Sequence, residues 1–156
     1  MSGLDRFVER ARDAGVEVDA RAFPEGTRTA ADAAAAIGCE VAQIVKSLVF
    51  VADDRPVLVL TSGANRVDTD RVAAQLGAAA ARKATAEEVR SATGYGIGGT
   101  PPLGHETDLP VLLDEDLLAH DEVWAAAGTA QHVFPLAPDR LREVAGAQVA
   151  AVADRP

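Results

Sequence analysis

The sequence contains little cysteine, few aromatic residues and little lysine. Its 156 residues include one cysteine and 4% aromatic residues, and only Lys46 and Lys83 among its 15 basic residues are lysines. A single cysteine, Cys39, cannot form a disulfide within the chain, which agrees with a reducing compartment. The hydrophobic fraction of 48% with so few aromatic residues indicates a globular protein packed with small side chains.

Long apolar runs and an excess of positive charge are also missing. The sequence has no run of about 18 apolar residues, and its first ten residues are charged too early for a signal peptide, so we expect a cytoplasmic protein with no membrane contact. The net charge of −9 argues against broad binding to a nucleic-acid backbone, DNA included. The densest basic interval, residues 66–90, also carries acidic residues and is typical of solvated helix faces.

The hydrophobic patterns predict one α+β or mixed α/β domain over residues 1–156, because strands and helices mix without strict alternation. Capping signals and periods of 3.6 predict helices at 4–11, 29–38, 68–76 and 85–93 and a helix led by Pro138. Alternating or continuous apolar runs predict strands at 16–23, 44–52, 57–63, 111–113, 123–126, 133–136 and 148–152. An Asp-Asp-Arg-Pro turn is expected to join the second and third of these strands.

Lys46 stands inside an apolar run, "CEVAQIVKSLVF". In a strand, it shares one face with Ile44, Leu48 and Phe50. An arbitrary lysine would pack its stem and leave its ammonium in water. Here apolar residues continue on both sides, so we expect the ammonium to face a cavity, where a charge without partners is costly.

Two glycine-containing stretches have less specific patterns. "GYGIGGTPPLGH", residues 94–105, allows close backbone approach and presents N–H groups, yet it matches neither a Walker loop nor a dinucleotide fingerprint, and a stiff surface turn fits it as well. "AAAGTAQHVF" contains Gly128 and Thr129 between two strand-like runs, which also fits a hairpin turn.

Taken in order, "IVKSLVF", "GIGGTPPLGH" and "AAGTAQHVF" resemble the YbaK/prolyl-tRNA synthetase-associated domain family. The resemblance covers residues 29–145 and implies a mixed or barrel-like sheet surrounded by helices. It also implies an aminoacyl-tRNA deacylase that clears mischarged tRNA, with tRNA-Pro or another tRNA carrying a small non-cognate amino acid as the substrate. It implies Lys46 as the catalytic residue and a substrate-binding set of Ser47, Gly98, Gly99, Thr100, Pro101, Pro102, Gly128 and Thr129. Many relatives have proline after the Gly-Thr pair, whereas this chain has Ala130, Gln131 and His132.

The implied chemistry is ester hydrolysis at the tRNA 3′ end, with no cofactor and no metal. The Lys46 ammonium would orient the ester, and the backbone of residues 98–102 would supply donors to the developing oxyanion. The nucleophile would be water, the neighbouring ribose hydroxyl or the substrate's own side chain. The expected partner is the aminoacylated acceptor end, with a synthetase or an elongation factor holding the rest of the tRNA.

Several alternatives stay open. A module that binds a synthetase or the charged tRNA end without turnover would also use Lys46 and the glycine loop. A Schiff base on Lys46 is a second option. Cys39 with His105, His120 or His132 could form a thiol–imidazole pair, although a small buried cysteine is the simpler interpretation. The three histidines lack metal-ligand spacing, and the run Asp114, Glu115, Asp116 is explained by helix capping.

Overall fold

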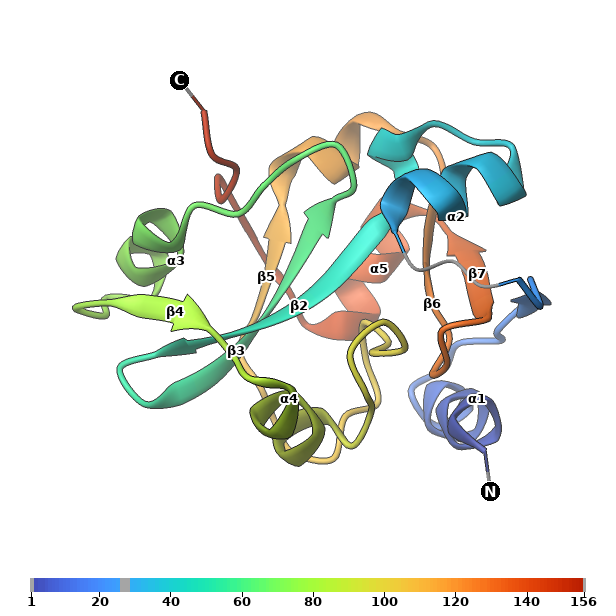
Figure 1. Cartoon of the computed structure of the whole chain (residues 1–156), viewed down its shortest axis with the longest axis horizontal. Helices are drawn as coiled ribbons and strands as arrows, with labels where there is room; N and C mark the ends of the chain where they lie inside the picture. The colour runs from blue at the N-terminus through green and yellow to red at the C-terminus, as the bar shows by residue number, and fades with distance from the viewer. Residues whose placement is uncertain (1, 26–28, 156) are drawn as a thin grey trace.

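A computed structural model of the chain describes residues 2–25 and 29–155. Five α-helices surround two β-sheets, and the two chain ends lie on opposite sides of the molecule (Figure 1). The α-helices are α1 (Gly3–Asp13), α2 (Ala30–Ile37), α3 (Thr69–Leu76), α4 (Ala86–Thr93) and α5 (Pro138–Ala145). The strands are β1 (Arg21–Ala22), β2 (Val45–Ala52), β3 (Arg55–Ser62), β4 (Ala81–Lys83), β5 (Val111–Asp114), β6 (Val123–Ala126), β7 (His132–Leu136) and β8 (Gln148–Ala150). Two short 3₁₀ helices, η1 (Val41–Gln43) and η2 (Glu115–Ala119), precede β2 and follow β5.

The larger sheet is mixed and has the strand order β4-β2-β3-β5-β8. β2 pairs antiparallel with both β4 and β3, whereas β5 and β8 run parallel to β3. The turn between β2 and β3 consists of Asp53 and Asp54, both at positive φ (46° and 68°). Two such residues form the tight hairpin turn that matches strand twist, so Arg55 and Pro56 belong to β3 and not to the predicted turn.

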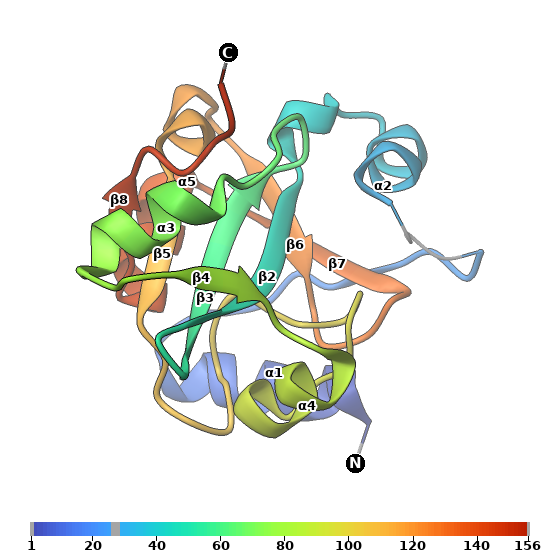
Figure 2. The same cartoon turned by 60° about the vertical axis from the view of Figure 1, so that its left-hand side comes forward.

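The smaller sheet is antiparallel, with the order β1-β7-β6. A single bridge between Ile44 and Trp124 links it to the start of β2. The described strands therefore form two sheets and not a closed barrel (Figures 1 and 2). The α+β fold class predicted from the sequence is confirmed, and of the two sheet arrangements considered, the mixed sheet is the one observed.

β2 packs on both faces, as its period of two predicts. Val45, Val49 and Val51 belong to one hydrophobic cluster, together with Phe7 and Phe134. Leu48 and Phe50 belong to a second cluster on the opposite face, where Val72 of α3 packs. Lys46 shares this second face, which confirms the predicted alternation.

The predicted helices all form, and local capping explains their ends. The hydroxyls of Thr29 and Thr85 accept from the third residue of α2 and α4 at 3.0 and 3.2 Å, and Thr85 with Glu88 completes a capping box. Pro138 begins α5 at the position where a missing N–H has no cost. These contacts lie within four residues of each helix end, so they can be identified in the sequence.

One predicted strand is much shorter than expected, and one observed strand is not predicted by the sequence. The predicted strand at 16–23 contributes only Arg21 and Ala22. Val16, Val18 and Ala20 do turn toward the first cluster, so their alternation reports burial without strand pairing. β4 was missed because its three residues, Ala-Arg-Lys, include two exposed cations and form a short sheet edge.

No helix within residues 2–25 and 29–155 is long and apolar enough to cross a membrane.

Candidate active site

A cavity of about 520 Å³ opens beside the first half of β2, which is the size of a small-molecule site. Its walls come from the start of α2, from β2, from the loop that follows α4, and from β6 and β7. Much of the wall is apolar, and Trp124, Val133 and Ile44 close one side. The cavity therefore offers a largely apolar space with a few polar groups.

One edge of β2 is exposed to this cavity. β4 pairs only with Phe50–Ala52, and the bridge to Trp124 involves only Ile44. The backbone between these two contacts, residues 45–48, has no strand partner on that side within the described residues. Consecutive residues 44–48 accordingly line the cavity. This edge can offer backbone donors and acceptors to a bound molecule.

Lys46 lies in the cavity wall, in agreement with the sequence prediction of a lysine facing a cavity. Its Nζ donates to the backbone oxygen of Asn65 at 2.6 Å. No carboxylate within residues 2–25 and 29–155 lies at ion-pair distance from it. Burial lowers the pKa of Lys46, the charges of Lys83 and Arg66 lower it further, and Asp114 opposes the shift.

Ser47 also lines the cavity, and its hydroxyl is buried with no hydrogen-bond partner within the described residues. A buried hydroxyl without a hydrogen-bond partner costs free energy, and a bound ligand that bonds to the hydroxyl removes this cost. Ser47, for which the family resemblance implies substrate binding, therefore lies in the cavity wall.

The glycine loop after α4 contributes Gly98 and Thr100 to the cavity wall. Gly98 has φ of +88°, a conformation that favours glycine. The Gly99 N–H and the Thr100 hydroxyl both bond to the Gly96 oxygen, at 3.1 and 3.0 Å. The N–H groups of Gly98 and Thr100 donate to no acceptor among the described residues.

Gly99, Pro101 and Pro102 belong to the same loop but do not line the cavity. A Cβ on Gly99 would lie 2.9 Å from Thr129 Cα and 3.2 Å from the Gly128 oxygen, so only glycine fits this contact. The imidazole of His105 bonds the Pro101 oxygen at 2.7 Å through Nε2, and burial lowers the pKa of His105. A neutral ring with hydrogen on Nε2 suits that bond.

Gly128 and Thr129 likewise lie outside the cavity wall and support the glycine loop from behind. They form part of the connection between β6 and β7, as a hairpin turn would. The Thr129 hydroxyl lies 2.7 Å from His132 Nδ1 and accepts from the Gln131 N–H at 3.1 Å. The structure therefore brings Lys46, Ser47, Gly98 and Thr100 together, and it places the other predicted substrate-binding residues in a second layer.

α1 braces the same loop, which the sequence did not indicate. Arg6 donates to the Gly94 oxygen and stacks 4.4 Å from the Tyr95 ring centre, and Arg10 bonds the Gly104 oxygen at 3.0 Å. Figures 1 and 2 both show α1 and α4 toward the same end of the molecule. These arginines lie 88 and 94 residues from their partners, so no local signal could reveal the contacts.

The rim of the cavity carries two exposed large hydrophobic residues, Val41 and Ile97, with exposed fractions of 36% and 63%. No other large hydrophobic side chain among the described residues is as exposed. Exposed apolar groups beside a cavity are typical of a binding surface.

The thiol–imidazole alternative at Cys39 finds little support. Burial raises the pKa of the Cys39 thiol, which disfavours the thiolate that a nucleophilic cysteine needs. Within residues 2–25 and 29–155, no group of three or more histidine, cysteine, aspartate or glutamate side chains is arranged to hold a metal ion.

The chain matches a family model and several known proteins. The model of the aminoacyl-tRNA editing domain matches residues 24–144. A solved structure provisionally described as a trans-editing enzyme for prolyl-tRNA synthetase superimposes with a TM-score of 0.94 at 45% identity, covering 99% of each chain. The proline–tRNA ligase of Limosilactobacillus fermentum is 34% identical over 106 residues, which are 65% of this chain and 18% of the ligase. A protein of Enterococcus faecalis provisionally named Cys-tRNA(Pro)/Cys-tRNA(Cys) deacylase EbsC is 26% identical over 84% of this chain and 80% of its own length. These findings confirm the resemblance seen in the sequence, and the chain belongs to the aminoacyl-tRNA editing domain family.

Proposed function

We propose that the cavity around Lys46 hydrolyses the ester that joins a wrong amino acid to the 3′ end of a tRNA. The observation that carries this proposal is the Lys46 ammonium, which is half-buried in the wall of an apolar cavity without a counter-ion in the described part of the chain. Membership of the editing-domain family and the activities named for its relatives support the same reaction. The substrate would be tRNA-Pro or another tRNA with a small non-cognate amino acid.

The reaction needs no nucleophile from the protein. Water or the substrate's side chain adds to the carbonyl carbon, gives up its proton and forms a tetrahedral oxyanion. If the neighbouring ribose hydroxyl attacks instead, the ester moves to that oxygen, and water must then attack the new ester to release the amino acid. When the intermediate collapses, the bond between the carbonyl carbon and the ribose oxygen breaks, and that oxygen takes up a proton. The Lys46 ammonium holds the ester, and the free N–H groups of Gly98 and Thr100 would stabilise the oxyanion.

Ser47 and the apolar wall would receive the aminoacyl group. The Ser47 hydroxyl lacks a partner and can bond a polar atom of the substrate. Ile44, Trp124 and Val133 surround the remaining space and would contact the amino-acid side chain. The second-layer glycines and prolines keep the loop at a fixed distance from β2.

The acceptor end would contact few basic residues. Lys83 pairs with Phe50 on the sheet face that also carries Lys46. Arg66 follows Asn65, whose backbone oxygen accepts from the Lys46 ammonium. Both side chains are exposed, and neither has an ion-pair partner in the described part of the chain. These two cations would form a small site for phosphates beside Lys46, on a chain of net charge −9.

We therefore expect a shallow salt dependence of tRNA binding. Two phosphate contacts predict a slope of about −1.4 for log K against log salt, because each contact with a single strand contributes about −0.7. Arg66→Gln and Lys83→Gln should each reduce the slope by about 0.7. Arg55→Gln removes an exposed charge at the far end of the hairpin and should leave the slope unchanged. A slope several times steeper in the wild type would reveal a basic surface elsewhere.

The test of the function is a deacylation panel with purified protein. tRNA-Pro and other tRNAs charged with alanine, cysteine, serine or the cognate amino acid are incubated with the protein, and the remaining ester is measured. We expect turnover of at least one small non-cognate ester and sparing of the cognate one. Binding of charged tRNA without any ester loss would favour a non-catalytic module.

A synthetase or an elongation factor is the proposed protein partner, because the small cationic site can grip little beyond the acceptor end. Adding the matching synthetase should raise the apparent affinity for charged tRNA in the same assay. A deacylase of this kind would act in the cytoplasm, where tRNA is charged.

A further inference from the structure

We propose that Asn65 and Asp114 are positioning residues, which hold the Lys46 ammonium at the ester and keep it charged. The inference rests on the proposed role of Lys46. Neither residue lines the cavity, and their effect on the reaction would pass through Lys46 alone.

The strand register brings the three side chains to one end of one sheet face. Lys46 of β2 pairs with Thr61 of β3, and the pairing of Leu60 with Leu113 places Asp114 of β5 beside Thr61. The preceding set of paired residues across β2, β3 and β5 on this face, Leu48, Val59 and Leu112, is apolar. A polar row of Lys46, Thr61 and Asp114 therefore ends the apolar face.

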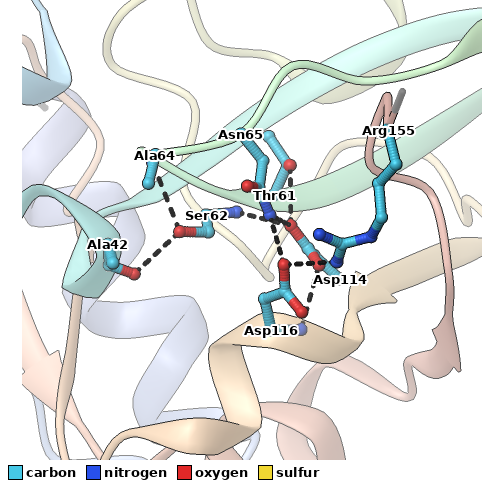
Figure 3. A network of polar contacts seen from close by, with 8 residues as sticks. All are labelled: Ala42, Thr61, Ser62, Ala64, Asn65, Asp114, Asp116 and Arg155. Carbon is cyan, nitrogen blue, oxygen red and sulfur yellow. Dashed lines mark hydrogen bonds and ion pairs between the residues drawn. The ribbon is translucent and has the colours of Figure 1, made fainter.

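Asp114 is fully buried, and its carboxylate accepts four hydrogen bonds from the described residues. Its Oδ2 accepts from the Thr61 hydroxyl, the Ser62 N–H and the Asn65 Nδ2 at 2.9 to 3.0 Å, as Figure 3 shows. Its Oδ1 accepts from the Asp116 N–H at 3.0 Å. Four donors are what an ionised carboxylate accepts, so the site is built for a buried negative charge.

Asn65 connects this charge to the lysine. Its Nδ2 donates to Asp114 at 2.9 Å and to Asp116 at 2.8 Å, and Arg155 fixes Asp116 from the solvent side at 2.6 Å (Figure 3). These bonds fix the side chain of Asn65, and its backbone oxygen accepts the Lys46 Nζ. The loop after β3 is further tied by the Ser62 hydroxyl, which donates to the Ala42 oxygen at 2.9 Å.

The charge of Asp114 favours the ammonium form of Lys46, in addition to the hydrogen bonds that position this ammonium. The groups that act on Lys46 are the cations Lys83 and Arg66, which lower its pKa together with burial, and Asp114, which raises it. Without the Asp114 charge, the ammonium would lose its proton at a lower pH. Asp114 therefore extends the pH range over which Lys46 is a cation.

The first experiment is Asn65→Ala, measured by single-turnover deacylation of the best substrate in the panel. Loss of both Nδ2 bonds frees the loop, and a displaced ammonium should lower kcat about 10-fold or more with a smaller change in KM. Asp68→Ala is the matched control, because it removes the side-chain cap of α3 nearby in the chain but no bond to Lys46. Its thermal midpoint should fall while kcat stays unchanged.

The second experiment is the pH profile of kcat/KM for Asp114→Asn, after subtraction of the uncatalysed ester hydrolysis. With its oxygen in the place of Oδ2, the amide still accepts from three donors, but its NH2 group then faces the Asp116 N–H, whose bond to Oδ1 is lost. The alkaline limb should shift to lower pH, because removal of the negative charge lowers the pKa of Lys46 further. A purely structural role would lower the rate without moving that limb.

The outcomes separate the two proposals. If Lys46→Ala keeps its activity, the proposed function of the cavity fails. If Lys46→Ala is inactive while Asn65→Ala keeps its kcat and Asp114→Asn keeps its alkaline limb, the function stands and the positioning role is overturned. Should Asp114→Asn fail to fold, the kcat of Asn65→Ala relative to Asp68→Ala decides the question.

Discussion

Replacing Lys46 with alanine is expected to lower the single-turnover rate of deacylation by about 100-fold or more, because a preorganised charge at the ester is lost. The fold should remain intact. Burial lowers the pKa of Lys46, so the ammonium is less stable in the folded chain than in the unfolded chain. Lys46→Met, which keeps the packed stem without the charge, should therefore unfold at or above the wild-type temperature while being equally inactive.

Two further measurements define the role of the lysine. Lys46→Arg should also be poor, because a planar guanidinium cannot place its charge where the ammonium contacts the Asn65 oxygen. Borohydride with a carbonyl ligand should leave Lys46 unmodified, and covalent trapping at this residue would favour the Schiff-base alternative. Near-normal turnover by a folded Lys46→Ala protein would refute its assignment as the catalytic residue.

Gly99→Val is expected to have the second largest effect, a loss of about 100-fold in turnover from misplacement of the oxyanion donors by roughly 1 Å. A Cβ at this position would lie 2.9 and 3.0 Å from the Thr129 Cα and carbonyl carbon. Backbone atoms cannot rotate away, so the loop with Gly98 and Thr100 must move off the β6–β7 connection. Single-turnover deacylation beside thermal unfolding measures both consequences.

Two variants serve as controls for this loop. Thr100→Val removes the bond to the Gly96 oxygen but keeps the side-chain shape, so its loss of activity should be milder. Gly77→Ala introduces strain at φ of +66° with no atom within 4 Å of the new Cβ, and it lies at the end of α3. It should lower stability but not turnover. If Gly99→Val loses activity and stability only in the modest proportion seen for Gly77→Ala, the loop is a structural turn.

The helices and the β2–β3 hairpin could be predicted from the sequence because their signals are local. Thr85 and Glu88 cap α4 within one turn, and the alternation along β2 places Lys46 on a known face. The lysine was conspicuous because an ammonium in an apolar run has a free-energy cost. The resemblance that identified the family depended on three short motifs carrying this same lysine, the glycine loop and the Gly-Thr turn.

The partners of these residues were decided by tertiary structure. Asp114 looked like part of a capping run, and it does cap η2, but its burial and its bonds to Thr61 and Asn65 come from strand pairing across β3 and β5. Gly99 looked like a cavity residue, whereas its missing side chain makes room for Thr129.

By itself, the sequence determined the helix ends, the faces of β2 and the identity of the lysine, since each depends on residues a few positions apart. Only the tertiary structure decided that Asn65 would hold the ammonium, that α1 would brace the glycine loop, and which of the predicted residues would reach the cavity. Contacts between residues 19 to 94 positions apart depend on how strands and loops pack together, and no local period or cap encodes them.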